Sequence, residues 1–434
     1  MRKLFKYNSV NPNDFLEKLI ASSTSEKHFT LLCSGGNVAN RVVKNEYEWV
    51  ASIGAIKTIS PQKNSFSELK SFVDEANDWL FGYLSYDLKN ELELLSSKND
   101  DGLEFPEMEF VQPEIVLIKN NKVIECHYIS SVDIKSKLHD IENTTVSESE
   151  TVVNFQSKIS KNKYIDDVEQ LLHHIRLGNV YEINYCQEFF ATPASFNPQT
   201  TYLEILNKFP TPFSCFVKNS SHYILSASPE RFLKKEGNKL FSQPIKGTIH
   251  RGETEVEDNR LAAELLANDK ERSENVMIVD LVRNDLSKVA TTGSVNVEEL
   301  FGIYSYQTVH QMISTVSAEI DKKCHPVDAI ESCFPMGSMT GAPKVKAMQL
   351  IEEFEQTKRG VYSGAVGYFS PNGNFDFNVI IRTLLYNDDN NYLSLMAGSA
   401  ITSQSNPHKE YEESLLKAQA FFDLVGAPKA KINA

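Results

Sequence analysis

The chain has 434 residues, of which 41% are hydrophobic and 24% are charged, and its formal net charge is −14. This length and composition predict a folded protein with two to three domain-sized units. The acidic excess disfavours nucleic acid and anionic membrane surfaces as partners, because both would repel the chain.

The beginning of the chain and its cysteines indicate the compartment. MRKLFKYNSVNPND has no apolar run of signal-peptide length, and the sequence has no uncharged apolar stretch of membrane-spanning length. The six cysteines form no C-x-x-C pair and lie in apolar surroundings, as expected of reduced, buried thiols. We therefore expect a cytoplasmic protein without a metal–thiolate site.

Residues 1–150 contain short β-like runs. These are FTLLCSGG, WLFGYLSYDL and EIVLIKNNKVIECHYI, and the last predicts a hairpin that turns at Asn120 and Asn121. Residues 130–156 are rich in Ser, Thr, Asp and Glu with little apolar periodicity, which predicts a linker. The chain thus divides into an N-terminal region, 1–150, and a second region, 151–434.

The second region carries stronger signals. Apolar residues at helical spacing reach Ile175, and Gly178 is typical of a helix C-terminus. Further strands are predicted at CFVK, YILSAS, RFLKK, KLFSQPI, GAVGYFS and FDFNVIIRTLLY, and helices at 257–267, 271–287, 326–334, 343–355 and 407–425. Many strands interleaved with a few helices, without regular βαβ alternation, favour an α+β fold.

Two pairs of glutamates are candidate metal ligands. Glu271 and Glu274 share one face of a predicted helix, and Glu410 and Glu413 repeat the spacing on the last helix. Four carboxylates from two helices suit Mg²⁺, which prefers oxygen ligands and retains waters. Such pairs also arise on the solvated faces of acidic proteins, so the spacing alone leaves both interpretations open.

Other polar residues lie in contexts that allow two interpretations. SMTGAPK at 338–344 is either an anion cradle at a helix N-terminus or a structural turn. Arg382, among apolar residues, needs a carboxylate from a ligand or from the protein. Tyr362 and AGSA at 397–400 are equally ambiguous, and His310 suits either a core or a catalytic position.

Glu230 in SASPERF precedes Lys246 in SQPIKGTI by a spacing that suits neighbouring strands joined by a hairpin. A glutamate and a lysine that face one pocket could act as proton donor and nucleophile. A cross-strand salt bridge is the alternative. Gly247 would weaken a strand, but it allows another group to approach the backbone closely.

The order of these segments resembles that of the chorismate-utilising enzymes, the family of anthranilate synthase component I and its relatives. The matching segments are SASPERF, PIKGT, ENVMIVDLVRNDL, TVHQM, GSMTGAPKVKAM, GVYSGAVGYF, VIIRTL, AGSAI and KEYEESLLKA. They cover the chain densely between about residues 157 and 425 and more loosely before residue 150. The resemblance implies two layered antiparallel β-sheets flanked by helices, with the active site between the sheets.

The resemblance also implies a role for each candidate residue. Four carboxylates would hold Mg²⁺, which binds the ring carboxylate of chorismate: Glu271, Glu274, Glu410 and Glu413. A second group would bind the rest of the substrate, including its enolpyruvyl carboxylate: Gly247, Thr248, Thr340, Gly341, Tyr362, Arg382 and Gly398. The implied catalytic residues are Lys246, Glu230 and His310.

Lys246 separates two branches of this family. In members with lysine the amine is taken to attack C2 of chorismate while the C4 hydroxyl leaves with a proton from the residue matched by Glu230. Ammonia then enters at C4 and displaces the lysine, whereas members that aminate C2 carry alanine. The attack requires a neutral amine, so we expect a depressed pKa for Lys246, caused by a nearby Mg²⁺ and partial desolvation.

Three positions depart from the family pattern. Glu182 replaces the glutamine usual in aminating members, and water-adding members have a lysine base there, so Glu182 disfavours water addition. AGSAI replaces the commoner AGAGI. TLLCSGG is similar to a segment of a tryptophan site in some relatives, which makes Ser34 a candidate tryptophan ligand.

The implied activity is an amino-group transfer that gives 4-amino-4-deoxychorismate, a step toward 4-aminobenzoate and folate. The sequence has no glutaminase signature, so we expect a separate glutamine amidotransferase subunit to supply ammonia, and we expect no additional lyase domain. Two alternatives remain open. One is amination at C2 with loss of pyruvate, and the other is a chorismate-binding homologue without activity.

Overall fold

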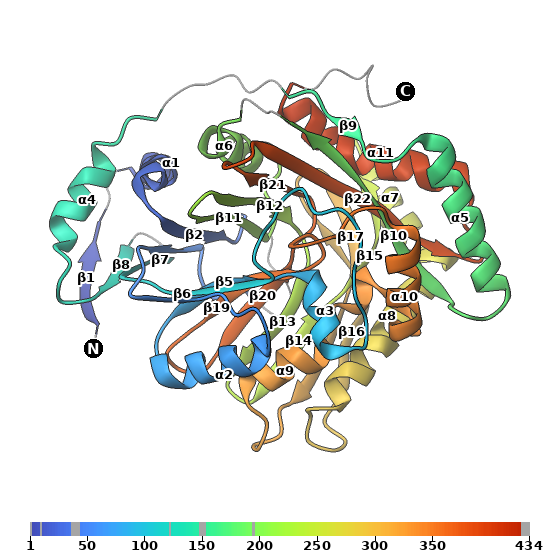
Figure 1. The fold of residues 1–434 in the computed structure, drawn as a ribbon, viewed down its shortest axis with the longest axis horizontal. Coiled ribbons are helices and arrows are strands. Elements are labelled where there is room, and N and C mark those ends of the chain that lie inside the picture. Colours follow the sequence, from blue (N-terminus) through green and yellow to red (C-terminus); the bar gives the residue numbers. More distant parts are fainter. Residues whose placement is uncertain are drawn as a thin grey trace.

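Two antiparallel β-sheets form the centre of the protein and helices cover their outer sides, as the computed structural model shows (Figure 1). The structure describes residues 2–8, 11–35, 44–120, 123–146, 153–192 and 196–426. The predicted α+β fold with two layered antiparallel sheets is confirmed. Across these ranges, no helix has both the length and the apolar character required to cross a membrane.

The first sheet joins strands from both ends of the chain. In spatial order its strands are β1 (Lys3–Tyr7), β8 (Val123–Tyr128), β7 (Ile115–Asn120), β3 (Trp49–Ile53), β2 (His28–Cys33), β11 (Phe213–Asn219), β12 (His222–Ser228), β21 (Thr383–Asn387), β22 (Tyr392–Thr402), β10 (Glu182–Ala191) and β18 (Gly341–Ala342), with β9 (Gln156–Ser157) beside β10.

The second sheet also joins strands from both ends of the chain. Its order is β15 (Ile245–His250), β17 (Val309–Glu319), β14 (Lys239–Gln243), β13 (Arg231–Glu236), β20 (Phe375–Val379), β19 (Ala365–Phe369), β5 (Leu80–Leu84), β6 (Met108–Gln112) and β4 (Lys57–Ile59), with β16 (Asn296–Ser305) beside β17. Strands from the predicted regions 1–150 and 151–434 therefore lie in both sheets. The boundary itself stays a prediction, because residues 147–152 lie outside the described residues.

The helices form the outer layers (Figure 1). Those associated with the first sheet are α1 (Pro12–Ser22), α4 (Ile134–Glu142), α5 (Lys161–Arg176), α6 (Pro198–Lys208), α10 (Lys344–Phe354) and α11 (Pro407–Leu424). Those associated with the second are α2 (Ser65–Ala76), α7 (Glu255–Ala267), α8 (Asp269–Ser287) and α9 (Pro326–Cys333). Short helical turns connect other elements: η1 (Ser23–Ser25), η2 (Tyr86–Leu88), α3 (Lys89–Leu92) and η3 (Gly337–Met339).

Both faces of the first sheet are buried. Val217 and Ile224 lie in the core between the two sheets, whereas their neighbours Phe216 and Leu225 pack into the core beneath the outer helices. Successive side chains of a strand point to opposite faces. This is why these strands read as continuous apolar runs instead of alternating with polar residues.

The predicted linker at 130–156 is wrong for residues 134–142, which form α4. Asp133 caps this helix by accepting hydrogen bonds from the amides of Lys135 and Ser136, while Leu138 and Ile141 are buried. The neighbouring prediction of a hairpin at 114–129 is confirmed by the β7–β8 pairing. Its turn residue Asn121 lies outside the described residues.

The run FDFNVIIRTLLY, predicted as one strand, is divided between the sheets. β20 ends at Val379 in the second sheet, and β21 begins at Thr383 in the first. The chain crosses between them at Arg382, whose φ of +52° lies in the left-handed region. Such a conformation is strained for a residue with a side chain and is common at functional sites.

The buried ion pair of Arg359 and Glu355 connects β10 with η3. Arg359 donates to Glu355 at 2.6 Å, and its remaining donors reach Met339 O at 2.6 Å and Asn184 O at 3.0 Å. The backbone amide of Cys186 donates to the same carboxylate at 2.9 Å. The pair therefore fixes β10 and η3 relative to each other.

We predict that Arg359→Met destabilises the protein by about 3–5 kcal/mol, because it leaves a buried, uncompensated Glu355 carboxylate. Urea unfolding measures the loss. The double variant Arg359→Met/Glu355→Gln should lose less than the sum of the two single variants, because it removes both charges. Strict additivity would contradict the proposed pairing.

Candidate active site

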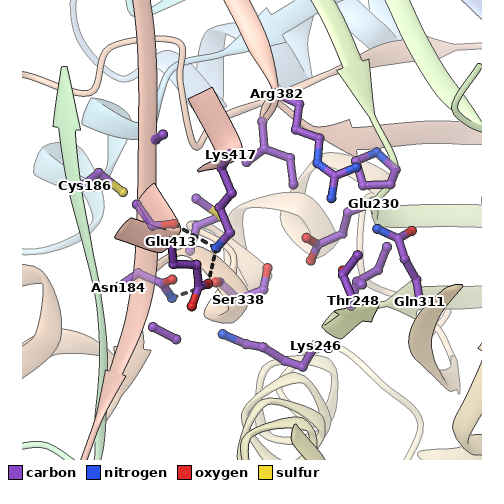
Figure 2. Close-up of a pocket in the computed structure, with 18 of the residues that line it drawn as sticks. Asn184, Cys186, Glu230, Lys246, Thr248, Gln311, Ser338, Arg382, Glu413 and Lys417 are labelled. Atoms are coloured by element: carbon purple, nitrogen blue, oxygen red, sulfur yellow. Dashed lines mark hydrogen bonds and ion pairs between the residues drawn. The ribbon is translucent and has the colours of Figure 1, made fainter. Parts of the chain in front are cut away.

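A cavity of about 470 Å³ lies between the sheets. β10 and β22 of the first sheet, β15 and β17 of the second, and α8 and α11 contribute its lining (Figure 2). Most of the predicted site residues line it together: Glu230, Lys246, Gly247, Thr248, Glu271, Glu274, Tyr362, Arg382, Gly398 and Glu413.

A β-bulge at Gly247 places Lys246 in this cavity. The register between β15 and β17 shifts between Ile245 and Thr248, and Gly247 has φ +90°. A Cβ atom on Gly247 would lie 3.1 Å from Glu271 Oε2. Only glycine combines this backbone conformation with such a close approach, and bulges commonly redirect a neighbouring side chain.

Lys246 pairs with Glu182 and not with Glu230. Its Nζ lies 2.7 Å from Glu182 Oε1, and the Glu182 side chain is fully buried on β10. The hairpin between Glu230 and Lys246 is formed by β13 and β14, while Lys246 lies on a further strand, β15, that pairs with β17. The predicted placement of the two residues on adjacent strands is therefore wrong, although both line the cavity.

The expected depression of the Lys246 pKa is also wrong for the groups that the chain provides. Burial lowers the pKa of Lys246, but attraction to Glu182, Glu274 and Glu230 outweighs burial and raises it overall. Desolvation of Lys246 can be inferred from the sequence, but its contact with Glu182 cannot, because residues 182 and 246 are distant in the chain. Lys246 is thus an ammonium in its resting state.

Glu230 has the properties of a proton donor. It lies in the turn between β12 and β13, and burial raises its pKa to about 7, with Ser338 and Lys246 opposing the rise. A carboxyl group with this pKa is partly protonated near neutral pH. Figure 2 shows Glu230 on the same side of the cavity as the Arg382 guanidinium.

Arg382 faces the cavity without a carboxylate partner from the described part of the chain. Burial lowers its pKa, opposed by Tyr306 and Glu230, and a guanidinium stays charged in any protein environment. The predicted need for a carboxylate is therefore unmet by the described protein groups. This cation is positioned to bind an anionic ligand.

The two glutamate pairs meet where α8 and α11 approach the cavity. Glu274 and Glu410 are buried, and Lys270 Nζ lies 3.8 Å from Glu274 Oε1 and from Glu410 Oε1. Glu274 Oε1 and Glu410 Oε2 have no hydrogen-bond partner among the described residues. Burial raises the pKa of Glu274 to about 7, so ionising it without a further cation is unfavourable.

These oxygens fit a cation that retains water ligands. In the described ranges, no three His, Cys, Asp or Glu side chains converge closely enough to form a direct metal site. Mg²⁺ requires only one or two direct carboxylates and binds others through water. The oxygens on two helices that lack a hydrogen bond within the described residues match that chemistry.

The remaining predicted residues do not line the cavity. Thr340 donates to Met336 O at 3.1 Å, and Gly341 allows β18 to approach the Glu182 carbonyl. Ser338 and Met339, which directly precede Thr340 in the chain, line the cavity instead.

His310 points away from the cavity, as expected for the strand neighbour of the lining residue Gln311. Its Nε2 lies 2.9 Å from Asp258 Oδ1, and its Nδ1 lies 2.9 Å from Ser305 Oγ. Ser34 lies in a separate cavity of about 50 Å³, where it donates to Glu48 O at 2.9 Å. The structure therefore does not bring His310 to the cavity, while a tryptophan site at Ser34 stays a prediction.

Two cations in the cavity were missed from the sequence. Lys417 donates to Glu413 Oε1 at 2.8 Å and to Gly398 O at 2.9 Å, and Lys270 lies between the glutamate pairs. Each lysine is four residues from a predicted glutamate, the spacing of helical ion pairs, and this signal could have found them. Figure 2 places Glu413 and Lys417 across the cavity from Glu230 and Arg382.

Residues 18–423 match the family model described as chorismate binding enzyme. The chloroplastic aminodeoxychorismate synthase of Arabidopsis thaliana is 39% identical over 65% of this chain and 31% of that protein. Aminodeoxychorismate synthase component 1 of Escherichia coli is 34% identical over 77% and 74%, and anthranilate synthase component 1 of Aquifex aeolicus is 33% identical over 80% and 74%. The chain spans about a third of the length of the plant relatives.

Solved structures share the fold. Anthranilate synthase component I from Streptococcus pneumoniae has a TM-score of 0.77 at 24% identity, covering 89% of this chain and 98% of that chain. The menaquinone-specific isochorismate synthase of Escherichia coli also has a TM-score of 0.77, at 16% identity, covering 98% and 95%.

The pKa of Glu230 makes stability depend on pH. A carboxyl group whose pKa is about 7 when folded and 4.5 when unfolded destabilises the native state as pH rises through this interval. The free energy of unfolding of Glu230→Gln, relative to that of wild type, should therefore increase by on the order of 2 kcal/mol between pH 5 and pH 8. Urea unfolding at both pH values tests this, with the exposed Glu236→Gln as control. If the unfolding free energies of Glu230→Gln and wild type differ by the same amount at pH 5 and pH 8, burial does not raise the pKa of Glu230.

Proposed function

The chain belongs to the family of chorismate binding enzymes, and we propose that it replaces the C4 hydroxyl of chorismate with an amino group. This would be the activity of an aminodeoxychorismate synthase component I, with 4-amino-4-deoxychorismate as product. The observation that supports it most is Lys246, an amine that lines the cavity at the position that resembles the lysine-bearing branch. Relatives named aminodeoxychorismate synthase agree with this choice.

The cavity suits a substrate with two carboxylates. Arg382 would bind one of them, with Tyr362 and the backbone at Gly398 beside it. Mg²⁺, when bound, would supply positive charge for the other carboxylate at the opposite side. Its proposed ligands, direct or through water, are Glu271, Glu274, Glu410 and Glu413.

Lys246 and Glu230 would carry out the chemistry. The Lys246 amine forms a bond to C2 while the C4–oxygen bond breaks, and Glu230 protonates the departing hydroxyl so that it leaves as water. Ammonia then forms a bond to C4, the ring double bond shifts back, and the bond between C2 and Lys246 breaks. Thr248 and Gly247 border the amine and would orient the ring.

Further assignments combine the family resemblance with the positions of the residues in the structure. Ammonia would come from a glutamine amidotransferase subunit, and the product would serve 4-aminobenzoate and folate synthesis in the cytoplasm. Ser34 would contact tryptophan, and Thr340 and Gly341 would support the cavity wall from behind. His310 would be a positioning residue, because its bond to Asp258 joins β17 to α7 beside β15.

One observation favours a second candidate. Anthranilate synthase component 1 relatives match a larger share of this chain than the plant aminodeoxychorismate synthases do. Amination at C2 is therefore the alternative that product analysis has to distinguish.

We predict that chorismate, Mg²⁺ and ammonia yield a 4-amino product and no fluorescent anthranilate. Mass spectrometry identifies the product, and a lyase that forms 4-aminobenzoate from it gives a second readout. Lys246→Ala should lose 4-amination even at ammonia concentrations that saturate wild type.

Lys246→Gln is the matched variant, since its amide can still donate to Glu182. Full activity of either variant would rule out the nucleophilic role. Anthranilate as the wild-type product would instead support amination at C2.

Mg²⁺ binding tests the glutamate pairs independently of turnover. Glu274→Gln and Glu410→Gln should each weaken Mg²⁺ binding by about tenfold or more, the loss typical of outer-shell ligands. Isothermal titration calorimetry measures it. Glu412→Gln, an exposed neighbour on α11, is the control and should bind as wild type. Equal affinities for all variants would refute the assignment.

A further inference from the structure

Lys246 directly contacts a carboxylate that is not part of the cavity lining. Glu182 Oε1 lies 2.7 Å from Nζ on the buried side of the lysine. Its strand is held on both sides, because Glu182 pairs with Thr402 of β22 and with Ala342 of β18. A Cβ on Gly341 would lie 2.2 Å from the Glu182 carbonyl oxygen, so a larger residue would displace this strand contact.

Glu182 has a carboxylate oxygen that is open to a proton. Its Oε2 is buried without a hydrogen-bond partner among the residues that the structure describes. Transfer of one proton across the 2.7 Å contact would turn an ammonium and a carboxylate into an amine and a carboxylic acid. The step changes no net charge inside the protein.

Other charged groups surround the amine, but they differ in position. The carboxylates of the cavity are Glu230 from the β12–β13 turn, Glu271 and Glu274 from α8, and Glu413 from α11. Its lysine cations beside Lys246 are Lys270 of α8 and Lys417 of α11. Within the described ranges, Glu182 is the carboxylate that forms a hydrogen bond with Nζ. Glu230 is required as a donor to the leaving hydroxyl.

Resting on the proposed function, we propose that Glu182 is the proton acceptor of Lys246. It takes a proton from the ammonium when substrate is in place and returns it when the lysine is released. Glutamine, usual at this position in aminating members of the family, cannot accept this proton. The departure at residue 182 thus supplies a base next to the reacting nitrogen.

The protons and electron pairs balance over one turnover. Lys246 gives one proton to Glu182 and uses the freed pair to bond C2, while the C4–oxygen bond breaks and Glu230 gives its proton to form water. The pair of ammonia then bonds C4, and the C2–nitrogen bond returns its pair to Lys246. Glu182 gives its proton back to that amine, and the new C4 ammonium gives its extra proton to Glu230.

Glu182→Gln tests the proposal, because it keeps the size and the hydrogen bond but removes the base. The measured quantity is kcat for the 4-amino product at saturating chorismate, Mg²⁺ and ammonia between pH 6.5 and 9.5. We expect a loss of about 100-fold at pH 7, typical of a missing general base. The rate of the variant should rise with pH, because the lysine proton must then pass to water.

Two controls separate base chemistry from structure. Glu188→Gln changes another buried glutamate of β10, which accepts hydrogen bonds from Ser394 and Tyr392, and it should keep the wild-type kcat and pH profile. Formate should restore part of the kcat of Glu182→Ala at pH 7. A purely structural role for Glu182 would give no such rescue.

The outcomes distinguish the two proposals. A wild-type protein that makes no 4-amino product would overturn the proposed function. A wild-type protein that makes it, with Glu182→Gln equal to it at every pH, would overturn only the role of Glu182. If Glu182→Gln does not fold, absence of formate rescue in folded Glu182→Ala overturns that role.

Discussion

The buried ammonium of Lys246 must be balanced by carboxylates, and this requirement connects the main layers of the molecule. The lysine comes from the second sheet and its direct partner Glu182 from the first. Glu274 adds attraction from α8. The arrangement depends on two glycines, Gly247 at the bulge and Gly341 at the close strand contact. The pair therefore depends on correct packing of the two sheets.

The cavity is held ready for an anionic ligand at a cost to the native state. Arg382 adopts a left-handed conformation and has no carboxylate partner in the described ranges. Glu274 and Glu410 each bury an oxygen that lacks a hydrogen bond within those ranges. Such strained and unsatisfied groups are typical of functional sites, where a ligand completes the interactions. The buried pair of Arg359 and Glu355 holds β10 and η3, which contribute to the cavity lining, in fixed positions.

Much of this arrangement could be predicted from the sequence, because local signals were strong. The last helix begins at Pro407 as its sequence predicts, and the spacing of Glu410 and Glu413 placed both on it. The crossing at Arg382 could not be predicted, since apolar residues continue across both strands and no glycine or proline marks the break. The Lys246–Glu182 contact could not be predicted from the sequence either, because it depends on how the two sheets pack.

The placement of His310 illustrates a different limit. A motif identifies a residue but not the face of the strand on which its side chain lies. Because successive side chains point to opposite faces, a residue one position away from a cavity-lining residue points away from the cavity. Gln311 lines the cavity, while His310 contacts Asp258 behind it.

The most direct test of the central claim locates the covalent bond. The protein is mixed with chorismate and Mg²⁺ without ammonia, quenched, digested and analysed by peptide mass spectrometry. A nucleophilic Lys246 should give a substrate-derived adduct, formed with loss of water, on the peptide that contains this lysine. An unmodified Lys246 under these conditions, in a protein that forms the 4-amino product once ammonia is added, would contradict it.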